Sequence, residues 1–156
     1  MIAAVAQPPS SRIEITRPAR MSSLPDFMQA LEQMCRQVPV AGEARDDLRV
    51  ALEEACSNVI NHAFAGRQAG DLTLVVEEQV ASGGPAVALV LQDRGMAFNP
   101  LTVPAPDVAV EAQDRAIGGL GVHLIRQMTD EQSYVHSDAG GNRFTLVKYL
   151  PGPRAA

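Results

Sequence analysis

The spacing of apolar side chains predicts two helices in the first half of the chain. Apolar residues recur three and four positions apart from Leu24 to Met34, which places them on one face of a helix that ends near Pro39. A second pattern of this kind opens at Gly42 and continues to about Ala63, before two glycines that stop it. We therefore expect each helix to bury one stripe and to expose the rest.

Short segments with strand patterns surround these helices. Residues 72–80 and 86–92 flank a Ser-Gly-Gly-Pro turn, which predicts an antiparallel hairpin, and a third helix, 122–128, follows the glycines at 118–121. Because helices and strands do not alternate along the chain, we predict an α+β fold, a two-layer sandwich of a mixed β-sheet with helices on one face. The predicted strands span residues 12–16, 72–80, 86–92, 131–136 and 143–150.

Length and composition indicate one domain. At 156 residues and 46% hydrophobic content, the chain is long enough for a single packed core. We expect a flexible tail at 1–11, one domain at 12–150 and a loose end at 151–156. Inside the domain, residues 94–117 show no regular pattern and include three prolines. A loop this long in a compact domain usually has a function.

Charge narrows the possible functions. The net charge is −5 and Lys148 is the only lysine, so no basic face for nucleic acid is evident. A Walker-type phosphate loop is excluded, because its lysine must precede Ser or Thr, whereas Lys148 precedes Tyr149. We find no apolar run of about 18 residues and no signal peptide. With two cysteines that lack metal-ligand spacing, these features predict a cytoplasmic protein that binds neither membrane nor nucleic acid.

Polar side chains flank the apolar stripe of the second helix. At about 100° per residue, Glu54, Asn58 and Asn61 fall within about 60° of one another, at the edge of the core. A carboxylate and two amides beside an apolar face provide a general base and oxygen ligands for a hard cation such as Mg²⁺. Taken alone, the spacing equally fits the ordinary polar flank of an amphipathic helix.

Asp93 and Gly95 follow the apolar run at 86–92. A carboxylate at this point could accept a hydrogen bond from the amino group of a ligand, and the glycine would let that ligand approach the backbone. The alternative is a plain strand-ending turn, where Asp and Gly are common. The pair by itself does not separate these two interpretations.

The glycine cluster at 118–121 opens the third helical pattern. Clustered glycines at a helix N-terminus direct backbone N–H groups to one point, an arrangement that suits a phosphate. The Rossmann fingerprint does not fit, since no convincing strand pattern precedes the cluster. Without a lysine, an anionic nucleotide here would need Mg²⁺, the helix terminus and an arginine such as Arg115 or Arg143.

These three features occur in an order and spacing that resemble one family. Residues 54–63, Glu-Ala-Cys-Ser-Asn-Val-Ile-Asn-His-Ala, resemble the N-box of the GHKL ATPases. Residues 93–100 and 118–125 look like their two glycine boxes, and residues 141–146 are similar to their last segment. The resemblance covers about residues 12–150 and points to the small stand-alone members, the anti-sigma factor serine/threonine kinases.

The resemblance implies the Bergerat fold, with ATP between the helical layer and a lid formed by residues 94–117. Glu54 would be the general base that accepts the substrate hydroxyl proton, Asn58 would hold Mg²⁺, and Asp93 would accept the adenine amino group. The nucleotide-binding residues that the resemblance implies are Asn58, Asn61, His62, Asp93, Gly95, Phe98, Gly118, Gly119, Leu120, Gly121, Val122 and Thr145.

Some members of this set have a specific implied role. Gly95 would give the adenine base room, Gly119 and Gly121 would donate backbone N–H groups to phosphate, and Thr145 would lie near the adenine or the phosphates. The first box departs from the larger GHKL proteins at Ala97, where they carry a second glycine, a departure that the small kinases often share.

The resemblance also implies partners. Members of this branch transfer the γ-phosphoryl group to a serine of a STAS-domain anti-anti-sigma protein, and as homodimers they sequester a sigma factor. We therefore expect a transcription regulator that works by partner switching. Three alternatives stay open: a nucleotide-gated binding module without kinase activity, a detached histidine-kinase catalytic domain, and a purely structural α+β domain. The missing phosphoacceptor region and the form of the first box argue against the second.

Overall fold

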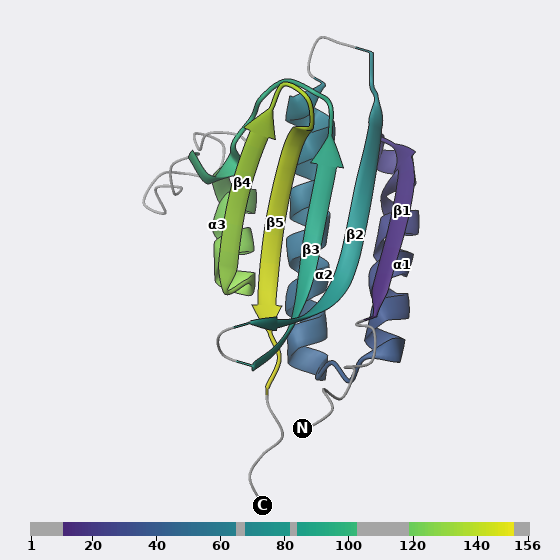
Figure 1. Ribbon diagram of the computed structural model, residues 1–156, viewed down its shortest axis with the longest axis vertical. Helices are drawn as coiled ribbons and strands as arrows, with labels where there is room; N and C mark the ends of the chain where they lie inside the picture. Colours follow the sequence, from purple (N-terminus) through teal and green to yellow (C-terminus); the bar gives the residue numbers. More distant parts are fainter. Residues whose placement is uncertain (1–10, 65–67, 82–83, 103–118, 152–156) are drawn as a thin grey trace, which may run out of the picture.

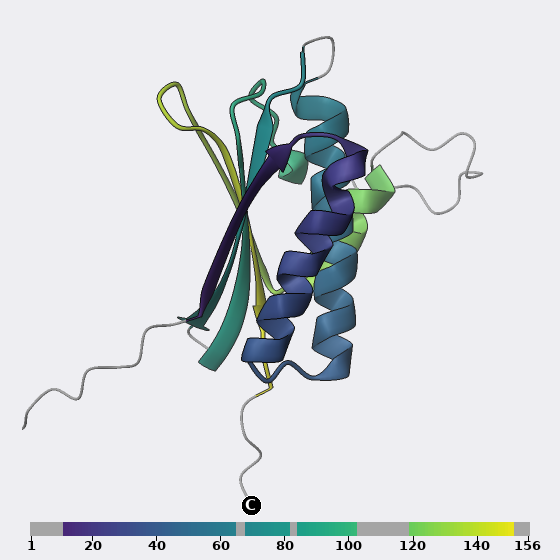
Figure 2. The same ribbon diagram turned by 90° about the vertical axis from the view of Figure 1, so that its right-hand side faces the viewer.

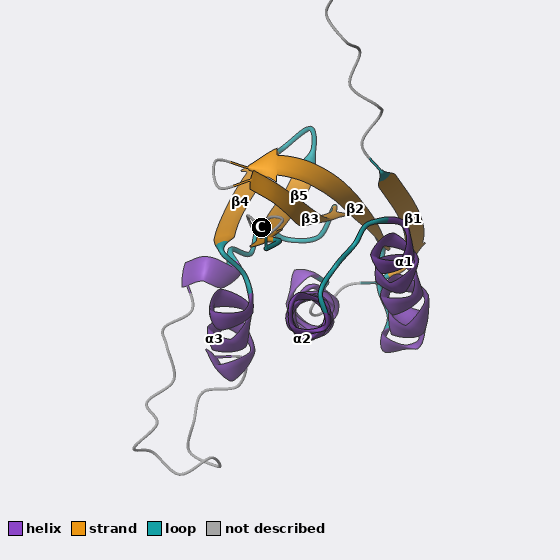
Figure 3. Ribbon diagram, turned by 90° about the horizontal axis from the view of Figure 1, so that it is seen from below, coloured by secondary structure: helices purple, strands orange, loops and turns teal. Residues whose placement is uncertain are grey.

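The computed structural model describes residues 11–64, 68–81, 84–102 and 119–151. Within these ranges a five-stranded sheet carries a layer of helices on one face (Figures 1 and 2). Seen from below, α2 lies between α1 and α3 in this layer (Figure 3). The three helices are α1 (Leu24–Gln37), α2 (Gly42–Asn58) and α3 (Gly119–Met128). The structure confirms the α+β class and the two layers.

The strands follow the predicted segments, with bounds that differ by at most two residues. The sheet order is β1-β2-β3-β5-β4, so that β1 and β4 form the edges. Three single turns complete the described elements: η1 (Met21–Ser23), the π-turn η2 (Val59–Ala63) and η3 (Pro100–Thr102). The strands are β1 (Arg12–Pro18), β2 (Asp71–Ala81), β3 (Gly84–Asp93), β4 (Glu131–Ser137) and β5 (Gly141–Tyr149).

All neighbouring strands in the sheet pair in the antiparallel direction, so the predicted mixture of strand directions is absent from the described sheet. The connection through α3 does bring β4 back parallel to β3, as a crossover helix normally does. However, β5 inserts between these two strands and runs opposite to both. The order of pairing therefore decides the sheet type, and local sequence patterns carry little information about that order.

The core lies between the sheet and the helices. In α1, Pro25 occupies the first turn, where its missing N–H group is not needed. Most of the apolar face of this helix is buried. Alternate residues of the strands point to the same layer, because side chains in a strand alternate between the two faces. Full burial of a leucine is worth about 1.5–3 kcal/mol. Completely buried large side chains include Phe27, Leu31, Met34, Leu48, Leu52, Leu74, Leu89, Leu91, Ile125 and Leu146.

Parts of three predicted segments, the two terminal tails and the lid, lie outside the described residues. Residues 1–10 and 152–156 make up most of the predicted terminal tails. Residues 103–118 include most of the expected lid, Gly118 and Arg115. Within the described chain, no helix combines the length and apolar character needed to cross a bilayer.

Candidate functional site

The structure brings most of the predicted residues to one end of the molecule, where α2 continues into η2. Glu54 and Asn58 are one helical turn apart on α2, and η2 follows directly after Asn58. A π-turn inside a helix often marks a functional site. We describe two groups of residues here. The Glu54 cluster consists of Glu54, Asn58 and Gly121, and the Asp93 cluster consists of Asp93, Gly95, Met96, Tyr134 and Asn142.

The last residue of β3, Asp93, is buried, with only 6% of its surface exposed. Its Oδ1 atom accepts two hydrogen bonds, one from the Gly95 backbone N–H at 2.8 Å and one from the Asn142 amide at 2.9 Å. A buried carboxylate needs such donors, because the loss of hydration is otherwise costly. The predicted binding residue is therefore held in one orientation by its neighbours.

Gly95 is required for a close approach between the loop after β3 and the end of η2. A Cβ atom added at Gly95 would overlap the backbone carbonyl group of Ala63. Next to it, the Met96 N–H donates a hydrogen bond to the same carbonyl oxygen at 2.8 Å. The glycine thus lets the Asp93 loop dock on the helix that carries Glu54 and Asn58, a reason beyond the room for a ligand that we expected.

A second contact connects these two elements. The rings of His62 and Phe98 stack with their centroids 4.9 Å apart and an angle of 24° between their planes. Stacked pairs of this kind stabilise by about 0.5–1.5 kcal/mol beyond the area that they bury. The Phe98 N–H also donates a hydrogen bond to the Tyr134 hydroxyl at 3.0 Å, which ties the loop to β4. His62 and Phe98 both belong to the predicted set, and the structure places their rings in contact.

Asn142 belongs to the site although the sequence patterns did not predict it. This residue is 3% exposed, pairs with Asp93 across β3 and β5, and bonds to it through the side chain. Its position after two glycines is typical of a turn residue. The signal that could have found it is strand parity, because Asn142 alternates with the inward residues Phe144 and Leu146.

The same parity separates Thr145 from the rest of the predicted site. Thr145 pairs with Val90 and lies two residues before Val147, so Thr145 and Val147 share one face of β5. Val147 belongs to a small cluster on the sheet face opposite the helices. Thr145 therefore lies on the outer face, away from the Asp93 and Glu54 clusters. The structure brings Asn142, three residues earlier, to the place for which the resemblance suggested Thr145.

The remaining predicted residues differ in exposure. Asn61 is exposed in η2, and Val122 is almost fully buried at 2%, so neither side chain joins the two clusters directly. Only the backbone is described for Gly119 and Leu120, at the start of α3. The first N–H groups of a helix have no partner within it, so this end of α3 provides donors for an anion.

Glu54 faces the first turn of α3. A Cβ atom added at Gly121 would lie 2.6 Å from its Oε2 atom, so the glycine makes room for the carboxylate. Within the described ranges, no hydrogen bond or ion pair reaches the Glu54 side chain. Burial raises the pKa of Glu54 above the usual 4.5, and the adjacent carboxylate of Glu53 raises this pKa further. A carboxylate in this state is suited to accept a proton.

Asn58 carries an unpaired polar atom. The residue is 7% exposed, and its Nδ2 atom is buried without a hydrogen-bond partner among the residues that the structure describes. Such a group costs about 1–3 kcal/mol. An amide can present either its nitrogen or its oxygen to a ligand, so Asn58 fits a phosphate oxygen or a hard cation.

A magnesium ion at Asn58 would find few protein ligands. Among the described residues, no three His, Cys, Asp or Glu side chains gather to hold a metal. Mg²⁺ commonly binds through one or two protein groups together with water and substrate phosphates. The amide oxygen of Asn58 is therefore compatible with Mg²⁺ only as part of a complex with a phosphorylated ligand.

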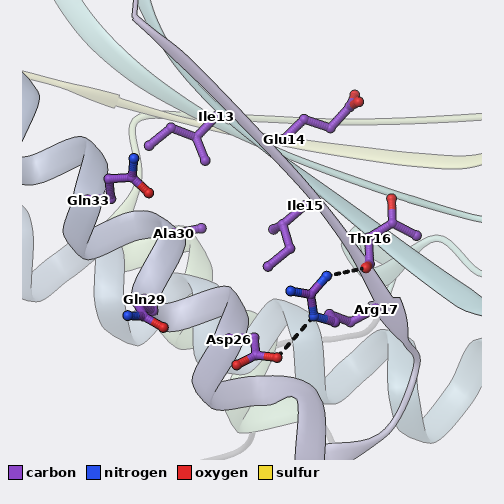
Figure 4. A pocket seen from close by; sticks show the side chains of 9 residues that line it. All are labelled: Ile13, Glu14, Ile15, Thr16, Arg17, Asp26, Gln29, Ala30 and Gln33. Carbon is purple, nitrogen blue, oxygen red and sulfur yellow. Dashed lines mark hydrogen bonds and ion pairs between the residues drawn. The ribbon is translucent and has the colours of Figure 1, made fainter.

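A separate cleft lies between the edge strand β1 and α1 (Figure 4). It has a volume of about 380 Å³ and includes the ion pair between Arg17 Nε and Asp26 Oδ2, which are 3.0 Å apart. Ile15 and Ala30 form part of its apolar wall. None of the predicted site residues lines this cleft, so it is distinct from the two clusters.

Comparison with known proteins identifies the family. Residues 17–148 match the model of the histidine kinase-like ATPase domain. The chain is 26% identical over 144 residues to a serine-protein kinase RsbW of Listeria monocytogenes, covering 89% of this chain and 87% of the relative. It is also 27% identical over 124 residues to the serine/threonine-protein kinase BtrW of Bordetella bronchiseptica, covering 80% and 84%.

The fold also occurs in a solved structure. The crystal structure of the RsbU and RsbW domains of a Mycobacterium tuberculosis protein superposes with a TM-score of 0.61 at 20% sequence identity. The match covers 93% of this chain and 34% of that one, so this chain spans about a third of the larger protein. The likeness confirms the arrangement of the sheet and helices.

Proposed function

The chain belongs to the family of histidine kinase-like ATPase domains, and from this premise we propose that it is a protein kinase that uses ATP and Mg²⁺. One observation carries the proposal. On α2, the buried Asn58 Nδ2 atom lies one turn from the Glu54 carboxylate, and neither group has a partner among the described residues. The helix also docks on the loop of Asp93. Unpaired polar groups that converge in this way are expected where a ligand binds.

The Asp93 cluster supplies the proposed site for the adenine base. Oδ1 of Asp93 is already occupied, and no hydrogen bond to Oδ2 is found among the described residues. We therefore assign Oδ2 as the acceptor for the amino group of adenine. At this position the carboxylate accepts from the 6-amino group of adenine and would repel the 6-carbonyl oxygen of guanine, so this contact favours adenine.

The Glu54 cluster supplies the proposed site for the phosphates. Asn58 would hold Mg²⁺, and the N-terminal N–H groups of α3 would donate to phosphate oxygens. When bound, Mg²⁺ neutralises charge on the transferred phosphoryl group. Lys148 is not available for this role, because its Nζ atom bonds to Asp47 at 2.9 Å, near the opposite end of β5 from Asn142.

Glu54 is the proposed general base. As the hydroxyl oxygen of a substrate serine bonds to the γ-phosphorus, its proton passes to the Glu54 carboxylate. The bond between the γ-phosphorus and the bridging oxygen breaks, and ADP leaves. The raised pKa of Glu54 makes this carboxylate a stronger proton acceptor than an exposed glutamate.

The names of the relatives support a protein substrate. Both the Listeria and the Bordetella relatives are named serine or serine/threonine kinases. The proposed substrate is a STAS-domain anti-anti-sigma protein, and a sigma factor is the second proposed partner of a homodimeric kinase. Phosphorylation of the first partner would then control release of the second, which regulates transcription.

The test combines binding and turnover. We expect the chain to bind ATP with Mg²⁺ in calorimetry and to transfer radiolabelled phosphate to a STAS protein encoded by a neighbouring gene. Glu54→Gln should keep the binding and lower the transfer rate by about 10²–10⁴-fold, as expected for loss of a general base. Glu53→Gln, at the exposed neighbour, is the matched control at neutral pH. Normal transfer by Glu54→Gln would remove the base assignment.

A second candidate is a nucleotide-gated binding module without phosphoryl transfer. The observation in its favour is that two arginines of the described chain form hydrogen bonds to backbone carbonyl groups. Arg94 donates to the Ala139 carbonyl oxygen at 2.9 Å, and Arg126 donates to the carbonyl oxygen of Leu101. A single-turnover assay separates the two functions, because only a kinase labels its partner when one ATP is supplied per site.

A further inference from the structure

The buried amide of Asn142 takes part in five hydrogen bonds. Its Nδ2 atom donates to Asp93 Oδ1 at 2.9 Å and to the Met96 carbonyl oxygen at 2.8 Å, with the Gly95 carbonyl oxygen at 3.4 Å. Its Oδ1 atom accepts from the Tyr134 hydroxyl and from His136 Nδ1, the latter at 3.1 Å. One side chain therefore joins β4, β5 and the loop after β3.

These partners allow only one orientation of the Asn142 amide. The Nδ2 atom faces three oxygen acceptors, so a rotation by 180° would bring Oδ1 against them without any hydrogen to share. On the other side, the Tyr134 hydroxyl accepts from the Phe98 N–H, which leaves its hydrogen free for Asn142. The direction of the donor toward Asp93 is thus set by the surrounding structure.

A fixed donor on one side of Asp93 determines which oxygen a ligand meets. Asn142 and the Gly95 N–H both donate to Oδ1, and two donors on one carboxylate oxygen hold the plane of the group. We propose that Asn142 is a positioning residue that orients Asp93, so that Oδ2 receives the exocyclic amino group of the adenine base. This role rests on the proposed function, and it adds a residue that sets base selectivity.

The competing interpretation is that Asn142 only ties the loop at 94–96 to β5. Loss of such a structural contact would disturb the whole site and lower the affinity for every nucleotide by the same factor. Loss of a positioning residue would lower the affinity only for ligands whose base donates to Asp93. The ratio of affinities for two bases therefore distinguishes the two roles, whereas a single affinity does not.

The test compares ATP with inosine triphosphate, whose base carries an oxygen in place of the amino group. With Mg²⁺ present, the wild-type chain should bind ATP more tightly. Asn142→Ala should weaken the affinity for ATP by about tenfold to a hundredfold, which corresponds to the loss of a hydrogen bond to a charged group. The affinity for inosine triphosphate should change by less than about threefold. Ser133→Ala, at an exposed position of β4, is the matched control and should change neither affinity.

Two further variants keep the test decisive if Asn142→Ala does not fold. Tyr134→Phe removes one partner of the Asn142 oxygen and should lower the affinity for ATP, but not for inosine triphosphate, by a few-fold. Asn142→Asp keeps the shape but replaces the donor with a carboxylate beside Asp93. Since two adjacent carboxylates share a proton, this variant should lose ATP affinity and approach equal binding of the two nucleotides.

Equal losses for both nucleotides, or no loss in any of these variants, would overturn the positioning role while leaving the proposed function intact. A wild-type chain that binds neither nucleotide would instead overturn the proposed function, and the positioning role with it. Selective loss of ATP in the variants, with unchanged thermal unfolding in Tyr134→Phe, supports the role of Asn142.

Discussion

The two halves of the site differ in how completely their polar groups are paired. In the Asp93 cluster, the Asn142 amide donates to the Asp93 carboxylate and to the Met96 carbonyl oxygen, and the Gly95 N–H donates to the same carboxylate. In the Glu54 cluster, no hydrogen bond to Glu54 is found among the described residues, and Asn58 has a buried unpaired nitrogen. Among the described residues, one half keeps only Asp93 Oδ2 open for a ligand. The other half contains a buried amide nitrogen and a carboxylate that a ligand or cation would satisfy.

The two glycines show the same difference. A side chain at Gly95 would overlap the backbone of Ala63, which cannot move without shifting η2. A side chain at Gly121 would meet only the tip of the flexible Glu54 side chain. The proposed base site is therefore built into the packing of the fold, whereas the proposed phosphate end depends on side chains that can still move. Substitutions at the two ends should consequently separate stability from chemistry.

The largest effect is expected for Gly95→Ala. The added Cβ atom meets backbone rather than a side chain, so the loop must leave η2, and the free energy of unfolding should fall by about 2–3 kcal/mol. Chemical denaturation measures this change. Gly42→Ala is the matched control, because nothing lies within 4 Å of its added Cβ atom. Equal stability of the two variants would contradict a rigid contact between Gly95 and Ala63.

Asn58→Leu should move binding and stability in opposite directions. Leucine has a similar size and removes the unpaired buried nitrogen, so the free protein should gain about 1 kcal/mol in the free energy of unfolding. Binding of ATP with Mg²⁺ should weaken by about tenfold or more, since the proposed ligand of the cation is lost. Denaturation without nucleotide and calorimetry with it provide the two measurements, and Ser57→Ala serves as the control. A loss of stability would show that Asn58 is satisfied in solution.

Gly121→Ala should lower phosphoryl transfer by about tenfold with little loss of stability. The Cβ atom displaces the Glu54 carboxylate, while alanine favours the helix over glycine by about 0.5–1 kcal/mol. Single-turnover rates and thermal unfolding measure the two effects. In the background of Glu54→Gln, the same substitution should add no further loss, because residues that act through one group are not additive.

The smallest effect concerns pH. Burial and Glu53 raise the pKa of Glu54, so the base becomes protonated at a higher pH than an ordinary glutamate. Glu53→Gln removes the second cause and should shift the acid limb of the transfer rate toward lower pH, most clearly at low salt. An unchanged pH profile would show that Glu53 does not influence the base.

The same pKa shift has a definite sign for stability. Between the unfolded and the raised folded pKa of Glu54, the native state binds more protons, so the free energy of unfolding falls as pH rises through this window. Glu54→Gln should abolish this fall, which denaturation at several pH values can measure.

Several features of the protein follow from short-range patterns in the sequence. The helices, the strands and their approximate bounds follow from periodicity, because a helix or a strand presents its apolar face at fixed spacings. The proximity of Glu54 to Asn58 follows in the same way, since residues four apart on a helix lie one above the other. The resemblance of residues 54–63, 93–100 and 118–125 to the GHKL boxes identified the family from such local segments.

Only the tertiary structure decided the partners of Asp93. Asn142 is 49 positions away in the chain, and it faces Asp93 because β5 lies between β3 and β4 in a particular register. A shift of that register by one residue would turn Asn142 outward and place its neighbours on the inner face. The same pairing places Thr145 on the outer face. Strand order and register arise from the packing of the whole sheet, so no local pattern in residues 141–146 could distinguish Asn142 from Thr145.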